Sequence, residues 1–205
     1  MKLNAKFIKL LPLLTGESTN GNWSKQEFIV ETKDNYPKRI VITNWNDQSA
    51  IFNLKENESY DFEITAESKL FNGNYYSTLV LNGSPVTTNA PISAPVSSFQ
   101  PFNSALKIIE FLPESSGTSW SKKELVFEPL NNTGKRFSVS FINNKIDLTG
   151  FSIGDEVLLG FYAESREHNQ RWFTEFKAWK IELTLKYKTE NNQKFDDSDP
   201  NNWPF

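Results

Sequence analysis

Apolar and polar residues alternate along most of this chain with a period of two residues, which is the period of a β-strand rather than a helix. The alternation marks the same series of short strands twice. The strands are expected at residues 7–11, 23–31, 38–45, 60–66 and 75–81, and again at 106–112, 120–128, 135–142, 157–163 and 172–185. A short helix fits near residues 47–54. The chain is therefore predicted to be almost entirely β-structure.

The alternation also predicts which side chains face the core. In the second strand, Phe28 and Val30 share one face, and Trp23, Lys25 and Ile29 share the other. The third strands should direct Ile40, Ile42, Phe137, Val139 and Phe141 inward. The same strands should direct Arg39, Trp45, Arg136 and Ile142 outward.

One segment of sequence occurs twice, 97 residues apart. The matching positions are residues 23–27 and 120–124, 38–39 and 135–136, 66–68 and 163–165, together with Asn35 and Asn132, Asn46 and Asn143, Asn72 and Asn169. Two copies of a small β module imply that the binding surface is itself repeated along the molecule. Such a surface favours the binding of an extended ligand over catalysis.

The repeat divides the chain into two domains, at residues 1–88 and 105–188. Residues 89–104 carry no charge and three prolines, which predicts a semi-stiff linker, and residues 189–205 form a polar, acidic tail expected to be disordered. Five short strands with little helix predict an oligonucleotide/oligosaccharide-binding (OB) barrel, a five-stranded Greek-key barrel, in each domain. A β-sandwich is the alternative.

Two loops in each module flank the ligand groove of an OB barrel. One joins strands one and two, at residues 15–22 and 115–119, and is four residues longer in the first module. The other joins strands four and five, at residues 70–74 and 167–171. Asn72-Gly73, in the first of these hairpins, is a strong two-residue turn signal.

The distribution of charge changes the picture of possible ligands. Residues 1–88 carry 9 Lys and Arg against 10 Asp and Glu, and residues 105–188 carry 12 against 11, so the two modules together are neutral. The tail carries 1 against 4 and holds the net negative charge. A neutral body lacks the basic footprint of a strong duplex-DNA binder. It is compatible with single-strand binding, in which stacking on aromatic rings shares the energetic work with charge.

Enzymatic and metal-binding functions are poorly supported. The chain has no Cys and one His, it shows no phosphate-cradling glycine loop, and His168 beside Ser165 and Glu164 has no counterpart in the first module. We therefore expect no enzymatic activity, no catalytic residue, no metal and no cofactor. The run at residues 7–12 is too short and too interrupted by lysine for a signal peptide or a membrane span. We expect an intracellular protein, in the host cytoplasm if a phage encodes it.

Several segments resemble known families. Residues 112–118, 120–125 and 164–179 resemble an OB-like domain family of uncharacterised function from bacteria and their phages. The tail is similar to that of bacterial-type single-stranded DNA-binding proteins (SSBs), which close with a short acidic run and a terminal Pro-Phe. The corresponding residues here are Asp196, Asp197, Asp199, Pro204 and Phe205, with Trp203 where those tails usually carry an aliphatic residue. This resemblance implies that the tip recruits replication or repair proteins.

The candidate ligand-binding residues are aromatic and basic side chains at outward strand positions or in the two loops. Aromatic rings stack on bases of any sequence, and Arg and Lys hold phosphates. The aromatic candidates are Trp23, Trp45, Phe71, Trp120, His168 and Trp172. The basic candidates are Lys25, Lys38, Arg39, Lys122, Lys135, Arg136, Arg166 and Arg171. Solvated charges paired with Glu27, Glu124, Glu67 or Glu164 are the alternative reading of the basic residues. Alternation places either Tyr75 or Tyr76 inside without deciding which.

The sequence therefore predicts a protein that coats single-stranded DNA without sequence preference during phage or bacterial DNA replication, recombination or repair. The alternative is a non-enzymatic protein-interaction or virion component, and a carbohydrate-binding module is a third reading that leaves the tail unexplained. DNA is not distinguished from RNA. Two tandem barrels can mimic a dimer or pair again with a second copy, and both arrangements stay open.

Overall fold

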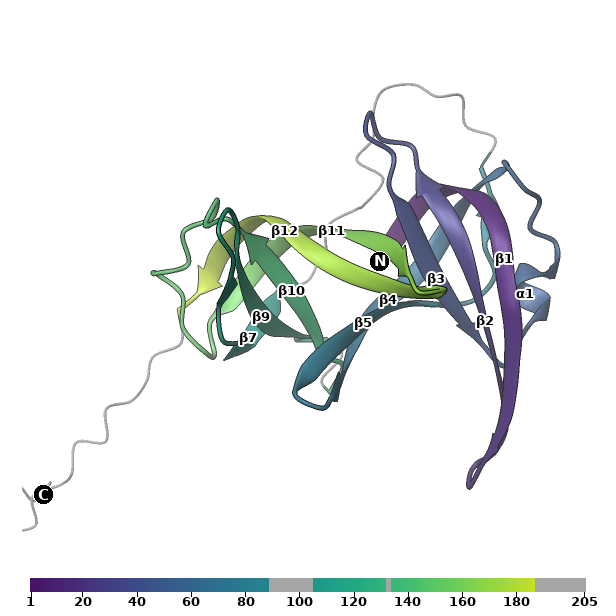
Figure 1. The fold of residues 1–205 in the computed structure, drawn as a ribbon, viewed down its shortest axis with the longest axis horizontal. Helices are drawn as coiled ribbons and strands as arrows, with labels where there is room; N and C mark the ends of the chain where they lie inside the picture. The colour runs from purple at the N-terminus through teal and green to yellow at the C-terminus, as the bar shows by residue number, and fades with distance from the viewer. Residues whose placement is uncertain (89–104, 132–133, 187–205) are drawn as a thin grey trace, which may run out of the picture.

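The computed structural model describes residues 1–88, 105–131 and 134–186. They form two small β-barrels that lie side by side, one built from each copy of the repeat (Figure 1). The expected linker at 89–104 and the expected disordered tail at 189–205 lie outside the described residues.

The first barrel consists of a three-stranded meander followed by two strands that close the barrel. Its elements are β1 (Lys2–Ser18), β2 (Gly21–Thr32), β3 (Arg39–Trp45), α1 (Ser49–Phe52), β4 (Ser59–Phe71), β5 (Asn74–Leu81) and β6 (Val86–Thr87). β1, β2 and β3 are antiparallel, and β4 pairs with both β1 and β5. β5 closes the barrel by running parallel to β3, with Ile42 opposite Leu79. This is the arrangement of an OB barrel.

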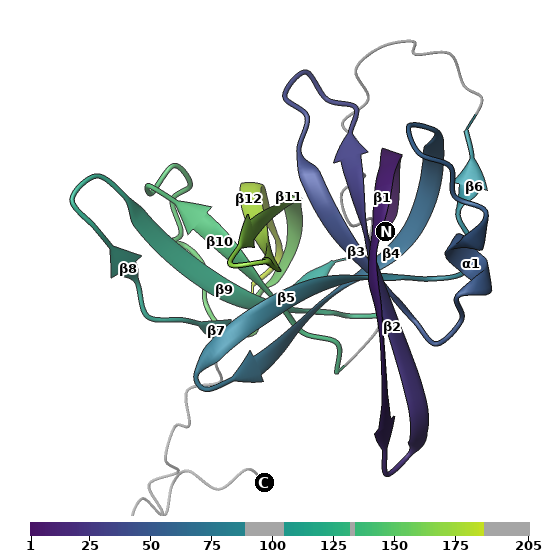
Figure 2. The same ribbon diagram turned by 45° about the vertical axis from the view of Figure 1, so that its right-hand side comes forward.

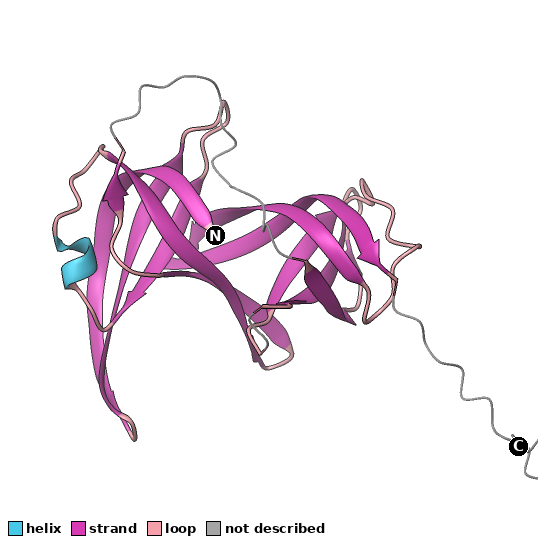
Figure 3. Ribbon diagram, turned by 180° about the vertical axis from the view of Figure 1, so that it is seen from behind, coloured by secondary structure: helices cyan, strands magenta, loops and turns pink. Residues whose placement is uncertain are grey.

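The second barrel repeats this order. Its elements are β7 (Leu106–Phe111), β8 (Ser115–Ser116), β9 (Ser121–Pro129), β10 (Phe137–Ile142), β11 (Glu156–His168) and β12 (Arg171–Leu185). β12 closes it parallel to β10, with Ser140 opposite Lys177. The prediction of two tandem OB barrels is confirmed, and the β-sandwich alternative is wrong. Figure 3 shows how completely strands dominate the described chain.

The cores follow the alternation read from the sequence. The predicted inward residues are all buried in the hydrophobic core: Phe28, Val30, Ile40, Ile42, Phe137, Val139 and Phe141. Phenylalanine fills much of the space. In the second barrel Phe161 lies 5.5 Å from both Phe137 and Phe176, measured between ring centroids. Burying each such ring stabilises the fold by about 1.5–3 kcal/mol relative to leaving it exposed.

The connection from strand three to strand four contains the expected helix only in the first barrel. There α1 places Ile51 in the core. In the second barrel the corresponding loop places Leu148 in the core instead. The loop is fixed by Asp147, whose carboxylate accepts hydrogen bonds from the backbone N–H of Thr149 at 2.9 Å and from its hydroxyl at 2.8 Å.

The first loop of the first barrel differs from its prediction. Residues 15–18 and 21–22 are strand, because β1 and β2 continue as a paired ribbon that runs from Leu13 opposite Gln26 to Ser18 opposite Gly21. The four extra residues lengthen a strand pair rather than a loop. The ribbon projects well beyond the barrel (Figure 2), and a bulge between Leu10 and Leu13 accompanies its departure.

The hairpin turn predicted at Asn72-Gly73 is present. Both residues have positive φ, 49° and 77°, as a tight two-residue turn with these residue types requires. The second barrel makes the same turn with Asn169 and Gln170, at φ 49° and 61°. Gln170 thus holds a conformation that side chains other than Gly, Asn and Asp rarely adopt.

The two barrels are joined by equivalent strands. β5 pairs antiparallel with β12, with Ser77 opposite Thr174, which is its counterpart in the repeat. On either side, Ser165 Oγ accepts from the backbone N–H of Val41 at 2.9 Å, and Ser68 Oγ accepts from the backbone N–H of Ser138 at 3.0 Å. These contacts are related by the same 97-residue offset. The barrels therefore form a pseudo-twofold pair within one chain.

Candidate nucleic-acid interface

The outer face of β2 and β3, which points away from the barrel core, carries an aromatic group where β2 begins and β3 ends. We call this the open end of the face. Trp23 and Trp45 meet edge to face, with ring centroids 6.1 Å apart. Lys25, opposite Trp45 in the strand register, has its Nζ 5.9 Å from the Trp45 ring centroid and 2.6 Å from Glu27. Trp45 is 40% exposed. The structure therefore brings three sequence-predicted residues together on one surface.

A glycine supports each of the equivalent tryptophans. The indole of Trp23 lies so close to Gly16 that an added Cβ would stand 2.5 Å from it. Trp120 packs on Gly117 in the same way, through its indole nitrogen. One face of each ring is thus held against backbone. Trp120 remains 49% exposed, so its ring is both fixed and accessible.

The second barrel presents a different neighbourhood around Trp120. Ile142 stands where the first barrel has Trp45, opposite Lys122. Lys122 Nζ lies 3.0 Å from Glu124 and 3.8 Å from Glu175. Both carboxylates compensate this lysine, so its charge is less available to a phosphate than a free lysine would be.

Glu164 and Lys177 continue this charged network on β11 and β12. Lys177 Nζ donates to Glu164 Oε2 at 2.7 Å, and Arg166 lies 3.3 Å from Glu164 Oε1. The hydrogen bond from Lys177 holds the pKa of Glu164 below its ordinary value, against the opposing effect of burial. The predicted binding residue Arg166 therefore has an acidic partner on its own strand.

The hairpin tip of the first barrel carries Phe71 and Tyr76, whose ring centroids lie 6.4 Å apart. Phe71 is 64% exposed and Tyr76 is 47% exposed. Tyr75 points elsewhere and donates its hydroxyl to Glu110 of the second barrel at 3.1 Å. Burial and this hydrogen bond raise the pKa of Tyr75. Of the two tyrosines, Tyr76 is the outward one.

The equivalent tip in the second barrel is more polar. His168 and Arg171 are exposed, and Trp172 is half-buried. His168 Nε2 lies 3.2 Å from the side-chain nitrogen of Asn169. Phe173 takes the place of Tyr76 and is exposed.

The basic residues that open strand three lie near the boundary between the barrels. Lys135 Nζ bonds Glu67 at 2.5 Å, and Lys38 Nζ stands 4.7 Å above the ring of Tyr162. Both contacts cross from one barrel to the other. Arg136 pairs with Glu128 at 3.1 Å, and Arg39 is exposed. The structure thus separates Lys38 and Lys135 from the tryptophan surfaces.

Each barrel covers part of the other's outer face. Ile29 and Val41 are opposite one another on β2 and β3, and both are buried outside the barrel core. β11 lies against β3 at this level, where Ser165 bonds Val41. Val126 is buried at the matching position in the second barrel. The outer face is therefore covered in its middle and exposed at its tryptophan end in both barrels.

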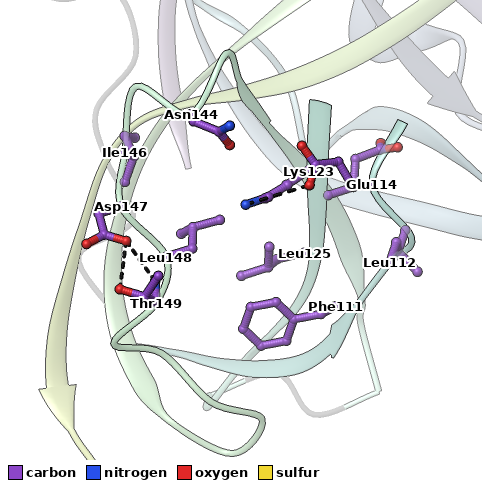
Figure 4. A pocket seen from close by; sticks show the side chains of 11 residues that line it. Phe111, Leu112, Glu114, Lys123, Leu125, Asn144, Ile146, Asp147, Leu148 and Thr149 are labelled. Carbon is purple, nitrogen blue, oxygen red and sulfur yellow. Dashed lines mark hydrogen bonds and ion pairs between the residues drawn. The ribbon is translucent and has the colours of Figure 1, made fainter. Parts of the chain in front are cut away.

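A cavity of about 510 Å³ lies elsewhere in the second barrel (Figure 4). It is bounded by β7, β9 and the loop that follows β10, with Phe111, Leu125 and Leu148 among its lining residues. Lys123 and Glu114 face each other 3.8 Å apart at its edge. None of the sequence-predicted binding residues lines it.

Sequence reasoning missed two exposed aromatics on these faces, Phe173 and Trp179. Trp179 lies on the long β12 within a bulge, where the register passes from Ala178 opposite Phe161 to Lys180 opposite Gly160 and skips Trp179. Simple alternation carried along β12 gives no reliable facing past such a bulge. The tail residues Asp196, Asp197, Asp199, Trp203, Pro204 and Phe205 lie outside the described residues. No helix in the described part of the chain is long and apolar enough to cross a membrane.

A family model for a domain of unknown function, DUF3127, matches the sequence twice, at residues 2–81 and 104–182. The chain belongs to the DUF3127 family. The two matches coincide with the two barrels, so each DUF3127 domain is an OB-like barrel. No curated protein matches the sequence.

Solved structures of SSB resemble the tandem DUF3127 arrangement. The wild-type single-stranded DNA-binding protein from Thermus aquaticus superposes with a TM-score of 0.54 at 8% identity, over 93% of this chain and 94% of that chain. A deletion mutant of the same protein gives a TM-score of 0.53 at 9% identity, over 93% and 97%. At such low identity the likeness is one of fold alone.

Proposed function

We propose that this DUF3127 protein binds single-stranded DNA without sequence preference, during phage or bacterial DNA replication, recombination or repair. The observation that carries the proposal is the pair of equivalent tryptophans, Trp23 and Trp120, each seated on a glycine at the open end of a barrel face. Similar structures from Thermus aquaticus are those of a single-stranded DNA-binding protein.

Stacking supplies the proposed affinity. A base stacked on an aromatic ring contributes about 1–3 kcal/mol whatever its identity. A ring already held on one face loses little freedom when a base covers the other. Trp23 and Trp120 are held in this way, Trp45 is exposed beside Trp23, and bases are free to stack on these rings only in a single strand. Stacking of this kind gives binding that does not depend on sequence.

In this proposal, charge contributes less to the affinity than stacking does. Lys25 and Lys122, the lysines nearest the tryptophans, each contact a glutamate. Few phosphates are therefore neutralised, and the logarithm of the affinity should fall with the logarithm of salt by about 0.7 for each phosphate contact. Duplex DNA, whose bases are already stacked, should bind far more weakly.

The test is a titration of fluorescently labelled dT of about 30 nucleotides, followed by anisotropy at two salt concentrations, with a duplex of equal length alongside. Saturable binding of dT that weakens moderately with salt supports the proposal. Equal binding to the duplex, or no binding at micromolar protein, contradicts it.

We further propose that the tail recruits partner proteins through its acidic run and its terminal Pro204-Phe205. The Pro-Phe pair suits an apolar pocket, and the neighbouring aspartates suit a basic rim. Removing residues 195–205 should leave dT binding intact or stronger and abolish partner capture. Loss of dT binding on that deletion would assign the tail to the DNA site instead.

One observation favours the alternative of a protein-interaction or virion component. Leu10, Leu13 and Leu14 are exposed along the projecting β1–β2 ribbon, and exposed apolar groups on a strand suit contact with another protein. The dT titration separates the two functions, because this alternative predicts no affinity for dT.

A further inference from the structure

The outer face of the second barrel carries a further tryptophan, Trp179 of β12, near its open end. In the parallel pair of β10 and β12, Ser140 is opposite Lys177. Ile142 and Trp179 each come two residues further along their strands. Gly160 lies between the core residues Leu159 and Phe161 and therefore faces outward, and its contact with the indole places Trp179 on the outer face. Ile142 is in turn opposite Lys122 on β9. Trp179 therefore lies on β12, the strand beside β10, towards the end of the outer face that carries Lys122.

Trp179 is supported in the same manner as the two tryptophans already described. Its indole packs on Gly160 of β11, where an added Cβ would stand 2.6 Å from the ring. It is nevertheless 54% exposed, somewhat more than Trp120. One face is held by backbone and the other is open. Among the described residues, close tryptophan contacts of this kind occur at Gly16, Gly117 and Gly160.

The two barrels thus differ in where their second tryptophan stands. The first barrel has Trp45 on its third strand and Asn82 at the position equivalent to Trp179. The second barrel has Ile142 on its third strand and Trp179 on its fifth. Each open face carries a glycine-seated tryptophan, a lysine and one further tryptophan.

We propose that Trp179 is a base-stacking residue that forms, with Trp120 and Lys122, the strand-binding platform of the second barrel. The proposal rests on the proposed function, because it places a further residue in the same single-strand site. It assigns this barrel a direct role in binding, and it directs the strand across β9, β10 and β12 rather than along the hairpin tip that carries His168.

The experiment labels the full-length wild-type chain with 5-fluorotryptophan and follows the ¹⁹F spectrum as dT is added. Single Trp→Phe variants assign the resonances of Trp179, Trp120 and Trp23. We expect the Trp179 resonance to shift in proportion to bound dT, together with that of Trp120. Shifts at Trp23 or Trp120 with none at Trp179 would overturn the inference and leave the proposed function standing. An unchanged spectrum with no dT binding by anisotropy would remove both.

Affinity provides the second readout. Trp179→Ala should weaken dT binding roughly 5-fold or more, which corresponds to the loss of one stacked base. Trp179→Phe should recover part of the loss, because phenylalanine keeps a π-face. Leu183→Ala, on the same strand and also exposed, is the matched control and should leave affinity unchanged. A role limited to covering Gly160 predicts lower stability for Trp179→Ala with unchanged affinity, and that result contradicts the inference.

Discussion

Ser77 and Thr174 occupy the same position in the two repeats, and they pair with each other where β5 meets β12. A contact between equivalent residues lies on a twofold axis, so the chain contains the geometry of a symmetric dimer within one polypeptide. Each of these residues also shares a side-chain hydrogen bond of 2.8 Å, Ser77 with Ser68 and Thr174 with Ser165. The small hydroxyl residues let the two barrels approach closely while satisfying buried backbone groups.

The serines at this boundary should matter for stability. Ser165→Ala removes the acceptor for the buried backbone N–H of Val41. An unsatisfied buried donor costs about 1–3 kcal/mol, so we expect a loss of that size in the free energy of unfolding. Urea denaturation measures it. Ser84→Ala, at an exposed serine, should change stability by less than about 0.5 kcal/mol. Equal stability of Ser165→Ala and wild type would show that this contact does not hold the barrels together.

Glycine at position 117 should be required for the seating of Trp120. Gly117→Ala introduces a methyl group into the space of the indole and should displace the ring. We expect weaker dT binding and a change in tryptophan emission. Gly150→Ala is the matched control, since no heavy atom lies within 4 Å of its added Cβ. Unchanged affinity for Gly117→Ala would argue against a pre-positioned ring.

Two lysines with similar ion pairs should behave differently. Lys25→Ala removes a cation beside Trp45 and leaves Glu27 near the stacking surface. We expect weaker dT binding and a salt slope smaller by about 0.7, the value for one lost phosphate contact. Lys135→Ala breaks a pair at the barrel boundary and should change stability by at most about 1 kcal/mol. Its dT affinity should match wild type. A larger loss of affinity for Lys135→Ala than for Lys25→Ala would place the strand at the boundary instead.

Acid should weaken the charged network of the second barrel. The pKa of Glu164 is lowered by its hydrogen bond from Lys177. A lowered pKa contributes stability above the ordinary glutamate value of about 4.3, and the contribution is lost as pH falls through the folded-state value. Glu164→Gln should therefore be less stable than wild type at neutral pH, by on the order of 1 kcal/mol. The difference should vanish in acid.

Thermal unfolding between pH 3 and 7 checks this dependence. Glu63→Gln provides the control, because Glu63 is exposed and its carboxylate lies 3.9 Å from Nζ of Lys2, which is also exposed. We expect that variant to unfold at nearly the same temperature as wild type at neutral pH, because exposed ion pairs contribute little to stability. A Glu164→Gln difference that stays constant across the pH range would show that packing, rather than charge, explains the effect.

Sequence alone predicted the barrels because the determining signals are local. Alternation identified Phe28 and Val30 as core residues, and Asn72-Gly73 identified a hairpin turn. The sequence did not predict how the barrels pair. Ser68 and Ser165 look like ordinary strand residues in the sequence, and their role appears only when the fold brings β4 to β10 and β11 to β3.

The candidate site was predicted in part for the same reason. Trp23, Lys25 and Trp45 lie on neighbouring strands in a register that alternation makes readable, and the structure brings them together. Lys38 and Lys135 have the same sequence signal as groove cations, yet their neighbours come from the other barrel. Gly16 is opposite Trp23 in the β1–β2 register, and the backbone N–H of Gly117 donates to the carbonyl of Trp120. The seating of each tryptophan therefore depends on backbone contacts that alternation does not describe.

The most direct test of strand binding by the two open faces compares Trp23→Ala/Trp120→Ala with wild type in the dT anisotropy titration. The control is Tyr36→Ala/Phe52→Ala, which removes two exposed aromatics that lie outside these faces. We expect the first variant to lose affinity at least tenfold, since each stacked base contributes about 1–3 kcal/mol, and the second to bind as wild type does. Equal dT affinity in all three proteins, with circular dichroism confirming that each is folded, would contradict the account.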